Sequence, residues 1–341
     1  MNDVMTHRSA GRQQRRRERS AAAALGPLST TLTTEYWVVN ETGRLADPSR
    51  VADLPGADGT DSPYSLAVET PACESCAELH RTLTDRLRST VTAAHDRGCR
   101  LLALGIRPDL LVDDSPTPAG QPPPTATAGT RVVFEPETAA AADCYNTLLA
   151  LDPAFACINT TGRVDGGQRY ACGRPSLTHG GATSRYRTPD EAVGSSHDTP
   201  AGTSPDRQPV AWLDGGSRIE WRSLDATTPT LLVDLIADIK TILQQAATRR
   251  LSVESFGNGF HGDRLVLPAP EWRAIYTSEA IHRGLSSLLV AAYLERFGIE
   301  TGWYRAGSPP AVDSVSASDL PALCRQRAAH LEAELGITQP A

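Results

Sequence analysis

Lysine, methionine and aromatic residues are scarce in this sequence. Lys240 is the only lysine, although lysine and arginine together number 33, and the 341 residues include 2 Met, 5 Phe and 5 Trp. Abundant arginine with almost no lysine is typical of a GC-rich or salt-adapted genome. The sequence also lacks any run of the ~20 apolar residues that a transmembrane helix needs, so we expect no membrane partner. The length allows one large domain or two of ordinary size.

The chain has no net positive charge outside its first twenty residues. The formal net charge is −7, and residues 1–20 hold six arginines against Asp3 and Glu18, so the remainder is acidic. Because phosphate binding requires clustered positive charge on the folded part, we expect no nucleic-acid partner. Residues 1–28 are interpreted as a disordered basic tail, although such a run could also contact an acidic partner.

The sequence has little that indicates secretion. The alanine-rich run after the first arginines breaks at Gly26-Pro27, before it reaches the length of a signal-peptide core. The cysteines number seven, which is odd, so we interpret them as reduced thiols and expect a cytoplasmic protein. Cys73-Glu-Ser-Cys76 could be a redox motif or half of a zinc site, but a second pair of ligands and a thioredoxin-like setting are missing. We interpret Cys73 and Cys76 as two incidental thiols.

Hydrophobic periodicity predicts strands and helices that do not alternate one for one. A strand of aromatic and β-branched residues in 33–45 runs into a turn at Gly43, and apolar residues every four positions predict a helix over 77–97. Further strands are expected at 64–70, 100–105, 131–134, 210–213 and 217–225, the last two as a hairpin, and further helices at 137–150, 229–247, 274–297 and 319–335, with Ser318 as the N-cap of the last.

The order of these elements predicts an α+β fold, with a mixed or antiparallel sheet and helices packed on one side. Residues 114–130 are rich in proline, and residues 160–208 have little periodicity, so both segments are expected to be irregular and poorly ordered. We therefore expect one domain over 29–337 that contains these two irregular segments.

Three acids lie on separate predicted strands: Glu35, Glu69 and Glu220. If the strands are neighbours and the acids share a face, they form a carboxylate-lined surface that could hold Mg²⁺, with Arg222 pointing the same way two residues after Glu220. Such a surface suits phosphoryl transfer. Alternatively, Glu and Arg on an exposed sheet face form cross-strand ion pairs with no further function.

Several segments resemble one known family in their amino-acid sequence and in their order along the chain. They are Thr34 to Leu45, Val68-Glu-Thr-Pro with the helix and strand that follow, Ile219-Glu-Trp-Arg-Ser-Leu-Asp-Ala, and Glu271-Trp-Arg-Ala-Ile-Tyr. Together they resemble the glutamate–cysteine ligases of the carboxylate–amine ligase type, which share the glutamine synthetase catalytic fold. The likeness covers roughly residues 31–300 as scattered patches.

The resemblance implies a reaction in which ATP phosphorylates the side-chain carboxylate of glutamate and an amine attacks the acyl phosphate. It implies ATP and Mg²⁺ as cofactors and a small amino acid as substrate. By carry-over, Glu35, Glu69 and Glu220 would be metal ligands, and Arg222 would be a catalytic clamp on phosphate or carboxylate. Arg273 would serve the substrate.

The sequence departs from the family pattern at several of its polar positions. Thr33 and Thr34 stand where the family's first strand carries acids. The strand in which the family has two alternating histidines reads Arg131-Val-Val-Phe-Glu here, and Ala269-Pro270 replace an acid and an asparagine. Each change removes a ligand or a polar group, and Mg²⁺ with few carboxylates binds weakly.

Two classes of function therefore remain open. The first is an ATP-dependent carboxylate–amine ligase with an eroded metal site and a changed substrate. The second is a catalytically impaired paralogue that keeps the fold as a binding or regulatory protein. The glycine-rich segment 256–263 could approach a phosphate, but it lacks the Lys-Ser/Thr of a phosphate loop and is better interpreted as a turn.

Overall fold

The structure is a computed structural model that describes residues 28–112, 126–165, 168–173, 186, 208–307 and 315–337. The basic tail and most of the two segments expected to be irregular lie outside these residues. Within them, the strands are β1 (Ser29–Asn40), β2 (Ser65–Glu69), β3 (Cys99–Leu102), β4 (Gly129–Glu135), β5 (Arg163–Asp165), β6 (Gln168–Tyr170), β7 (Val210–Leu213), β8 (Arg218–Asp225), β9 (Arg250–Glu254), β10 (Gly259–His261) and β11 (Arg264–Pro268). The helices are α2 (Pro48–Val51), α3 (Cys76–His95), α4 (Ala141–Ala156), α7 (Pro229–Ala246), α8 (Pro270–Arg283), α9 (Leu288–Arg296), α10 (Thr301–Gly307) and α11 (Leu320–Glu334).

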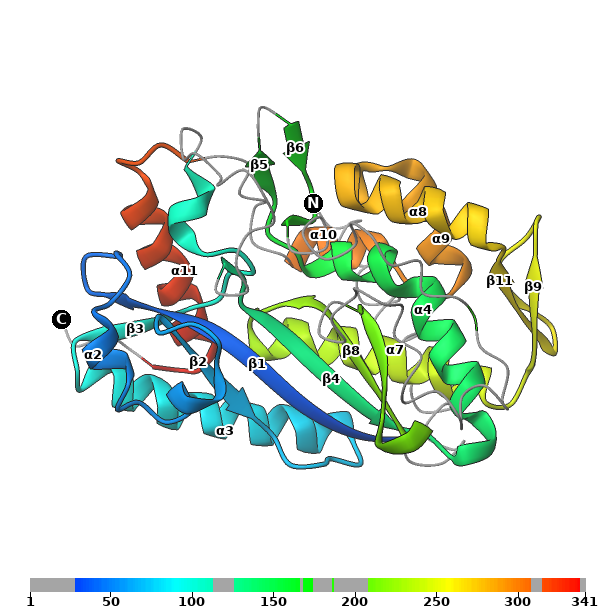
Figure 1. Cartoon of the computed structure of the whole chain (residues 1–341), viewed down its shortest axis with the longest axis horizontal. Helices are drawn as coiled ribbons and strands as arrows, with labels where there is room; N and C mark the ends of the chain where they lie inside the picture. The colour runs from blue at the N-terminus through cyan, green and yellow to red at the C-terminus, as the bar shows by residue number, and fades with distance from the viewer. Residues whose placement is uncertain are drawn as a thin grey trace, which may run out of the picture.

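The main sheet has the strand order β2-β1-β4-β8-β7, with β3 also paired to β1, and each of these pairs is antiparallel. Figure 1 shows β1 and β4 running side by side through the middle of the molecule. The predicted hairpin is confirmed, since β7 pairs with β8 across a tight turn at 214–216. The expected α+β class with an antiparallel sheet is confirmed as well.

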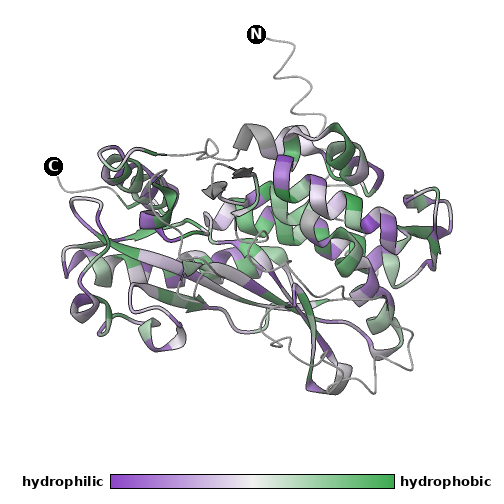
Figure 2. Cartoon of the chain, turned by 45° about the horizontal axis from the view of Figure 1, so that its top comes forward, coloured by the Kyte–Doolittle hydropathy of each residue, from purple (hydrophilic) through white to green (hydrophobic). Residues whose placement is uncertain are grey.

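Helices α3, α4 and α7 cover one face of this sheet. Leu32, Tyr36 and Val38 of β1 point to that face and are fully buried in the main hydrophobic core. The expected stripe of α3 packs against them, with Leu79, Leu83, Leu87 and Val91 all buried. Figure 1 shows α3 lying below the sheet, and Figure 2 shows hydrophobic and hydrophilic residues mixed along the helices. Burial of these side chains stabilises the helices more than their intrinsic propensity does.

The opposite face of the sheet is covered at one end by α11. Trp37 and Val39 of β1 pack there in a second, smaller core with Leu102 and with Cys324 of α11. The indole of Trp37 donates to the carbonyl of Leu104 at 3.0 Å. Beyond this small core, the same face carries the polar residues described in the next section.

Several sequence predictions were wrong in detail. The helix expected at 274–297 is two helices, because Gly284 has a φ of +56° and Ser287 caps α9 by accepting from the amide of Val290. The expected cap Ser318 does not begin α11, since Asp319 is the residue that precedes the helix. The small sheet β10-β11-β9 was not predicted. The β5-β6 hairpin lies inside the segment expected to be irregular.

Among the described residues, none of the helices combines the length and the apolar character that crossing a bilayer requires.

Candidate functional site

Strand register places the three predicted acids on one face of the main sheet. Thr33 of β1 stands opposite Glu69 of β2 and opposite Arg131 of β4, and Val133 of β4 stands opposite Glu220 of β8. Residues that oppose each other in a sheet, or lie two apart on one strand, point to the same side. The expected placement of Glu69 and Glu220 on one face is therefore confirmed. We call the face that carries Glu35, Glu69, Arg131, Glu220 and Arg222 the site face.

Glu35 forms an ion pair across the β1–β4 ladder. Its Oε1 lies 3.0 Å from Nη2 of Arg131, and the amide of Gly129 donates to its Oε2 at 3.4 Å. The Glu35 side chain is 16% exposed and that of Arg131 is 42% exposed, so the pair is accessible from the arginine side. Arg131 thus stands beside one of the three acids that the sequence analysis predicts as metal ligands.

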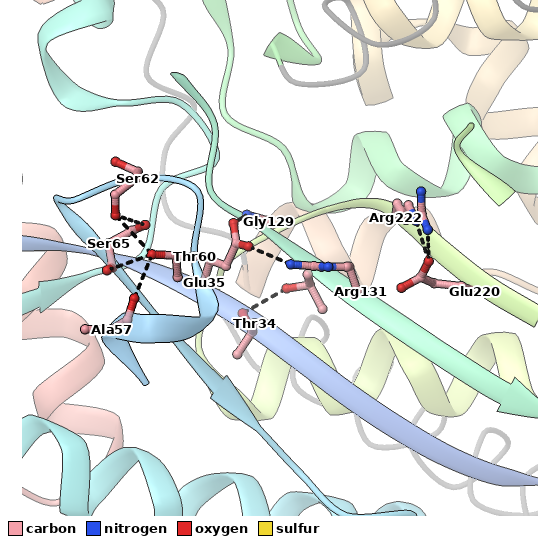
Figure 3. Close-up of polar contacts among 11 residues, drawn as sticks. Thr34, Glu35, Ala57, Thr60, Ser62, Ser65, Gly129, Arg131, Glu220 and Arg222 are labelled. Carbon is pink, nitrogen blue, oxygen red and sulfur yellow. Dashed lines mark hydrogen bonds and ion pairs between the residues drawn. The ribbon is translucent and has the colours of Figure 1, made fainter. Parts of the chain in front are cut away.

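Glu220 forms a second ion pair within β8. Arg222 contacts the Glu220 carboxylate through both Nε and Nη2, and the two side chains are 17% and 9% exposed. The β4–β8 register shifts between Thr130 and Val132, so Arg222 and Ser223 together face Arg131. Such a bulge re-aims side chains next to a site. Figure 3 shows the Glu35–Arg131 pair between β1 and β4, and the Glu220–Arg222 pair on β8.

The acids do not converge as a Mg²⁺ site would require. Within the described ranges, no group of three or more His, Cys, Asp and Glu side chains is placed to hold a metal ion. Glu69 lies exposed at the end of β2, while Glu35 and Glu220 are each paired with an arginine. The residues present therefore do not fit a Mg²⁺ centre in this arrangement, and the ligand role of the three glutamates stays a prediction.

Asp225, at the end of β8, holds three segments together beside the site face. It is 1% exposed, and its Oδ2 accepts from the amide of Thr161 at 2.5 Å. Its carbonyl accepts from the side chains of Thr130 and Asn159. Gly105, after β3, donates its amide to the Thr161 hydroxyl at 3.0 Å. No local pattern around Asp225 indicates this role, because its partners are distant in the sequence.

Gly105→Ala is expected to destabilise the protein. A Cβ at Gly105 would overlap the Asp225 carboxyl group, so the buried loop must shift, and such overpacking costs about 1–3 kcal/mol. Gly302→Ala is the matched control, because a Cβ there has no neighbour within 4 Å and the exposed position is helical. We expect that control to be neutral or more stable by up to about 1 kcal/mol. Urea denaturation of both variants measures the difference, and equal midpoints would contradict this account of Asp225.

Arg273, the fifth predicted site residue, lies on a different element from the other four. It stands in the first turn of α8, and its guanidinium carbon lies 5.2 Å from the ring centre of Tyr186. The hydroxyl of Tyr186 donates to the carbonyl of Pro268 at 2.7 Å. The assignment of Arg273 to a substrate stays a prediction.

Comparison with known proteins shows likeness in fold alone. No family model matches the sequence, and no curated protein matches it. A bifunctional glutathione synthetase from Pasteurella multocida is 10% identical with a TM-score of 0.50, covering 94% of this chain and 53% of its own. PafA, the ligase of the prokaryotic ubiquitin-like protein Pup, is 12% identical with a TM-score of 0.46, covering 91% and 64%.

The chain spans about half of that glutathione synthetase and less than two thirds of PafA. As the sequence resemblance implied, the chain has a glutamine synthetase-like fold.

Proposed function

We propose that the chain is a catalytically impaired relative of the carboxylate–amine ligases that binds a small amino acid on its site face. The observation that carries this proposal is the pairing of Glu35 with Arg131 and of Glu220 with Arg222. Each pair neutralises a carboxylate that resembles a metal ligand.

A divalent cation would meet unfavourable electrostatics beside these pairs. Mg²⁺ is bound through carboxylates and phosphate oxygens, and it demands near-ideal octahedral geometry. An arginine within 3.0 Å of Glu35 repels a cation at the same oxygens, and moving that arginine away exposes a half-buried carboxylate. Phosphoryl transfer from ATP depends on such a cation, so the arrangement favours binding over catalysis.

The order of charges suits a zwitterion. Two arginines on neighbouring strands lie between two glutamates, so a free amino acid can place its carboxylate on Arg131 and Arg222 and its ammonium on Glu35 or Glu220. Guanidinium groups bind carboxylates with paired, charge-assisted hydrogen bonds. The four protein charges sum to zero, as do those of the ligand, which makes the exchange of ion-pair partners electrically balanced.

The second candidate is an active ATP-dependent ligase of the glutamate–cysteine ligase type. Its support is the placement of Glu35, Glu69, Glu220 and Arg222 on one face of the sheet. The ligase requires ATP and Mg²⁺ to bind together, whereas a protein that only binds an amino acid does not.

Calorimetric titration of the full chain separates the two candidates. We expect glutamate, used as the probe among a panel of amino acids, to bind without metal. Arg131→Met should weaken binding about tenfold or more, because a hydrogen bond to a charged group contributes roughly 1.5–3 kcal/mol. Arg218→Met is the matched control, since Arg218 pairs with Asp214 at the far end of β8.

Mg²⁺-dependent ATP binding with formation of an amide product would overturn the proposal in favour of the ligase. Equal binding by wild type and Arg131→Met would show that the amino acid does not bind on the site face.

A further inference from the structure

Two thiols stand at the start of α3, on the helix-covered side of the sheet and away from the site face. Cys73 is fixed to β1 by two backbone hydrogen bonds with Thr30, at 2.9 and 3.0 Å, and its side chain is buried in the main core. Cys76 is the first residue of α3 and is half-buried. Two residues separate the thiols, and one of them, Ser75, caps the helix through the amide of Glu78.

The only lysine of the chain reaches this pair from another helix. Lys240 lies on α7, which packs against α3, and it is 5% exposed. Its Nζ donates to the carbonyl of Glu74, between the two cysteines, at 3.3 Å. Burial lowers the pKa of Lys240, while the neighbouring Cys76, Glu74 and Cys73 raise it. A buried ammonium beside two thiols is an arrangement that the spacing of the cysteines alone did not reveal.

The two thiols have different surroundings, which suit them to different chemical roles. A helix N-terminus and a nearby ammonium both favour the thiolate, which is the nucleophile in thiol chemistry. Cys76 has both of these features and is partly accessible. Cys73 is 1% exposed, and burial raises its pKa, as does Glu78, while Thr82 and Lys240 lower it. A small reagent therefore meets Cys76 first.

We propose that Cys76 is a thiol–disulfide exchange site for low-molecular-weight disulfides, with Cys73 as the resolving thiol and Lys240 as a positioning residue. The Cys76 thiolate attacks one sulfur of a disulfide RSSR, which forms a mixed disulfide and releases RS⁻. Cys73 then loses its proton and attacks Sγ of Cys76, which closes the Cys73–Cys76 bond and releases a second RS⁻. Overall, two protein thiols are oxidised and one RSSR is reduced to two RSH.

The oxidised bond would join the segment pinned to β1 to the first turn of α3. The exchange is independent of the proposed amino-acid binding, because Cys73 packs on the opposite side of β1 from Glu35.

Hydroxyethyl disulfide is the probe, and mass spectrometry of the full chain is the measurement. We expect wild type to lose two hydrogens at Cys73 and Cys76 and to release two mercaptoethanol molecules. Cys73→Ser should stop at the mixed disulfide on Cys76, and Cys76→Ser should leave Cys73 unmodified. Cys324→Ser is the matched control, because Cys324 lies on α11, is buried in the smaller core and should not alter the reaction.

The role of Lys240 is tested by the rate of Cys76 alkylation by iodoacetamide against pH. Lys240→Met should slow the reaction about tenfold at neutral pH and move its rate–pH curve to higher pH, while leaving the rate at the alkaline plateau unchanged. If this variant does not fold, the trapping of the mixed disulfide in Cys73→Ser still decides the order of attack.

Modification of Cys73 in Cys76→Ser as fast as in wild type would overturn the proposal. So would a wild-type product that stays a mixed disulfide, or identical rate–pH curves with and without Lys240.

Discussion

Thr34→Glu is expected to unfold the protein or to destabilise it by roughly 4 kcal/mol. Burial would raise the pKa of the new carboxyl group by about three units, and each unit costs about 1.4 kcal/mol. Thr34 has no exposed surface and points to the helix-covered face, where its hydroxyl lies 2.9 Å from that of Thr130. Thr130 in turn donates to the carbonyl of Asp225. A longer, charged side chain would break this chain of hydrogen bonds and overpack the core.

Thr33→Glu is the matched control, and it should change stability by less than about 1 kcal/mol. Thr33 is half-buried on the site face, opposite Arg131 and the exposed Glu69. Urea denaturation of the two variants gives the comparison, and a Thr34→Glu variant as stable as Thr33→Glu would show that the assigned faces of β1 are wrong. Titration of Thr33→Glu with Mg²⁺ also tests the remnant metal site, because each added carboxylate strengthens a site for a hard cation.

The two adjacent threonines show the limit of what the local sequence predicts about β1. Alternation of buried and half-buried residues holds from Ser29 to Glu35, and then four consecutive residues, Tyr36 to Val39, are buried. The change occurs because α11, nearly 300 residues later, covers the second face at Trp37 and Val39. Since Thr33 and Thr34 are identical in type, only the position of such distant elements decides which one faces the site.

Local sequence patterns predicted the helices and turns whose structure depends mainly on residues close together in the sequence. The four-residue spacing of Leu79, Leu83 and Leu87 places α3 correctly, and the turn at Gly43 has the positive φ of +82° that favours glycine. The break between α8 and α9 was missed because Gly284 sits within an otherwise helical pattern. A single glycine is tolerated in helices, so its effect depends on packing.

The polar site could be predicted only in part. The arginine at position 131 is visible in the sequence, but its ion pair with Glu35 depends on the β1–β4 register. The same limit applies to Asp225, whose partners lie on β4 and in the segment 159–161, and to Lys240, which donates to the carbonyl of Glu74 from another helix. In each case the neighbours are set by long-range pairing, which no local pattern predicts.

Glu332→Gln is expected to destabilise the protein by roughly 3–5 kcal/mol, because it leaves a buried arginine without its counter-charge. Glu332 of α11 is 2% exposed and accepts from Nε and Nη2 of Arg100 at 2.8 and 2.6 Å. Nε2 of His95 lies 3.0 Å from the same carboxylate. The carboxylate therefore joins α11 to β3 and α3, and glutamine keeps its size while removing its charge.

The pH dependence of stability follows from the same group. Burial raises the pKa of Glu332, but hydrogen bonds from Arg100 and His95 outweigh it, so the pKa lies below its ordinary value. A depressed carboxyl pKa contributes stability above the pKa of the unfolded chain, about 4.3, and loses it as pH falls through the folded value. Wild type should therefore lose part of its stability over that acidic range, and Glu332→Gln should lack this component.

Asp85→Asn is the control, since the Arg88–Asp85 pair is exposed and contributes less than about 1 kcal/mol. Urea midpoints of both variants, measured from neutral pH to pH ~3, give the test. The double variant Arg100→Met with Glu332→Leu separates charge from packing, because removing both partners of a buried pair leaves no uncompensated charge. It should recover most of the stability that Glu332→Gln loses. If the double variant is as unstable as Glu332→Gln, shape at the α11 contact and not charge holds the helix in place.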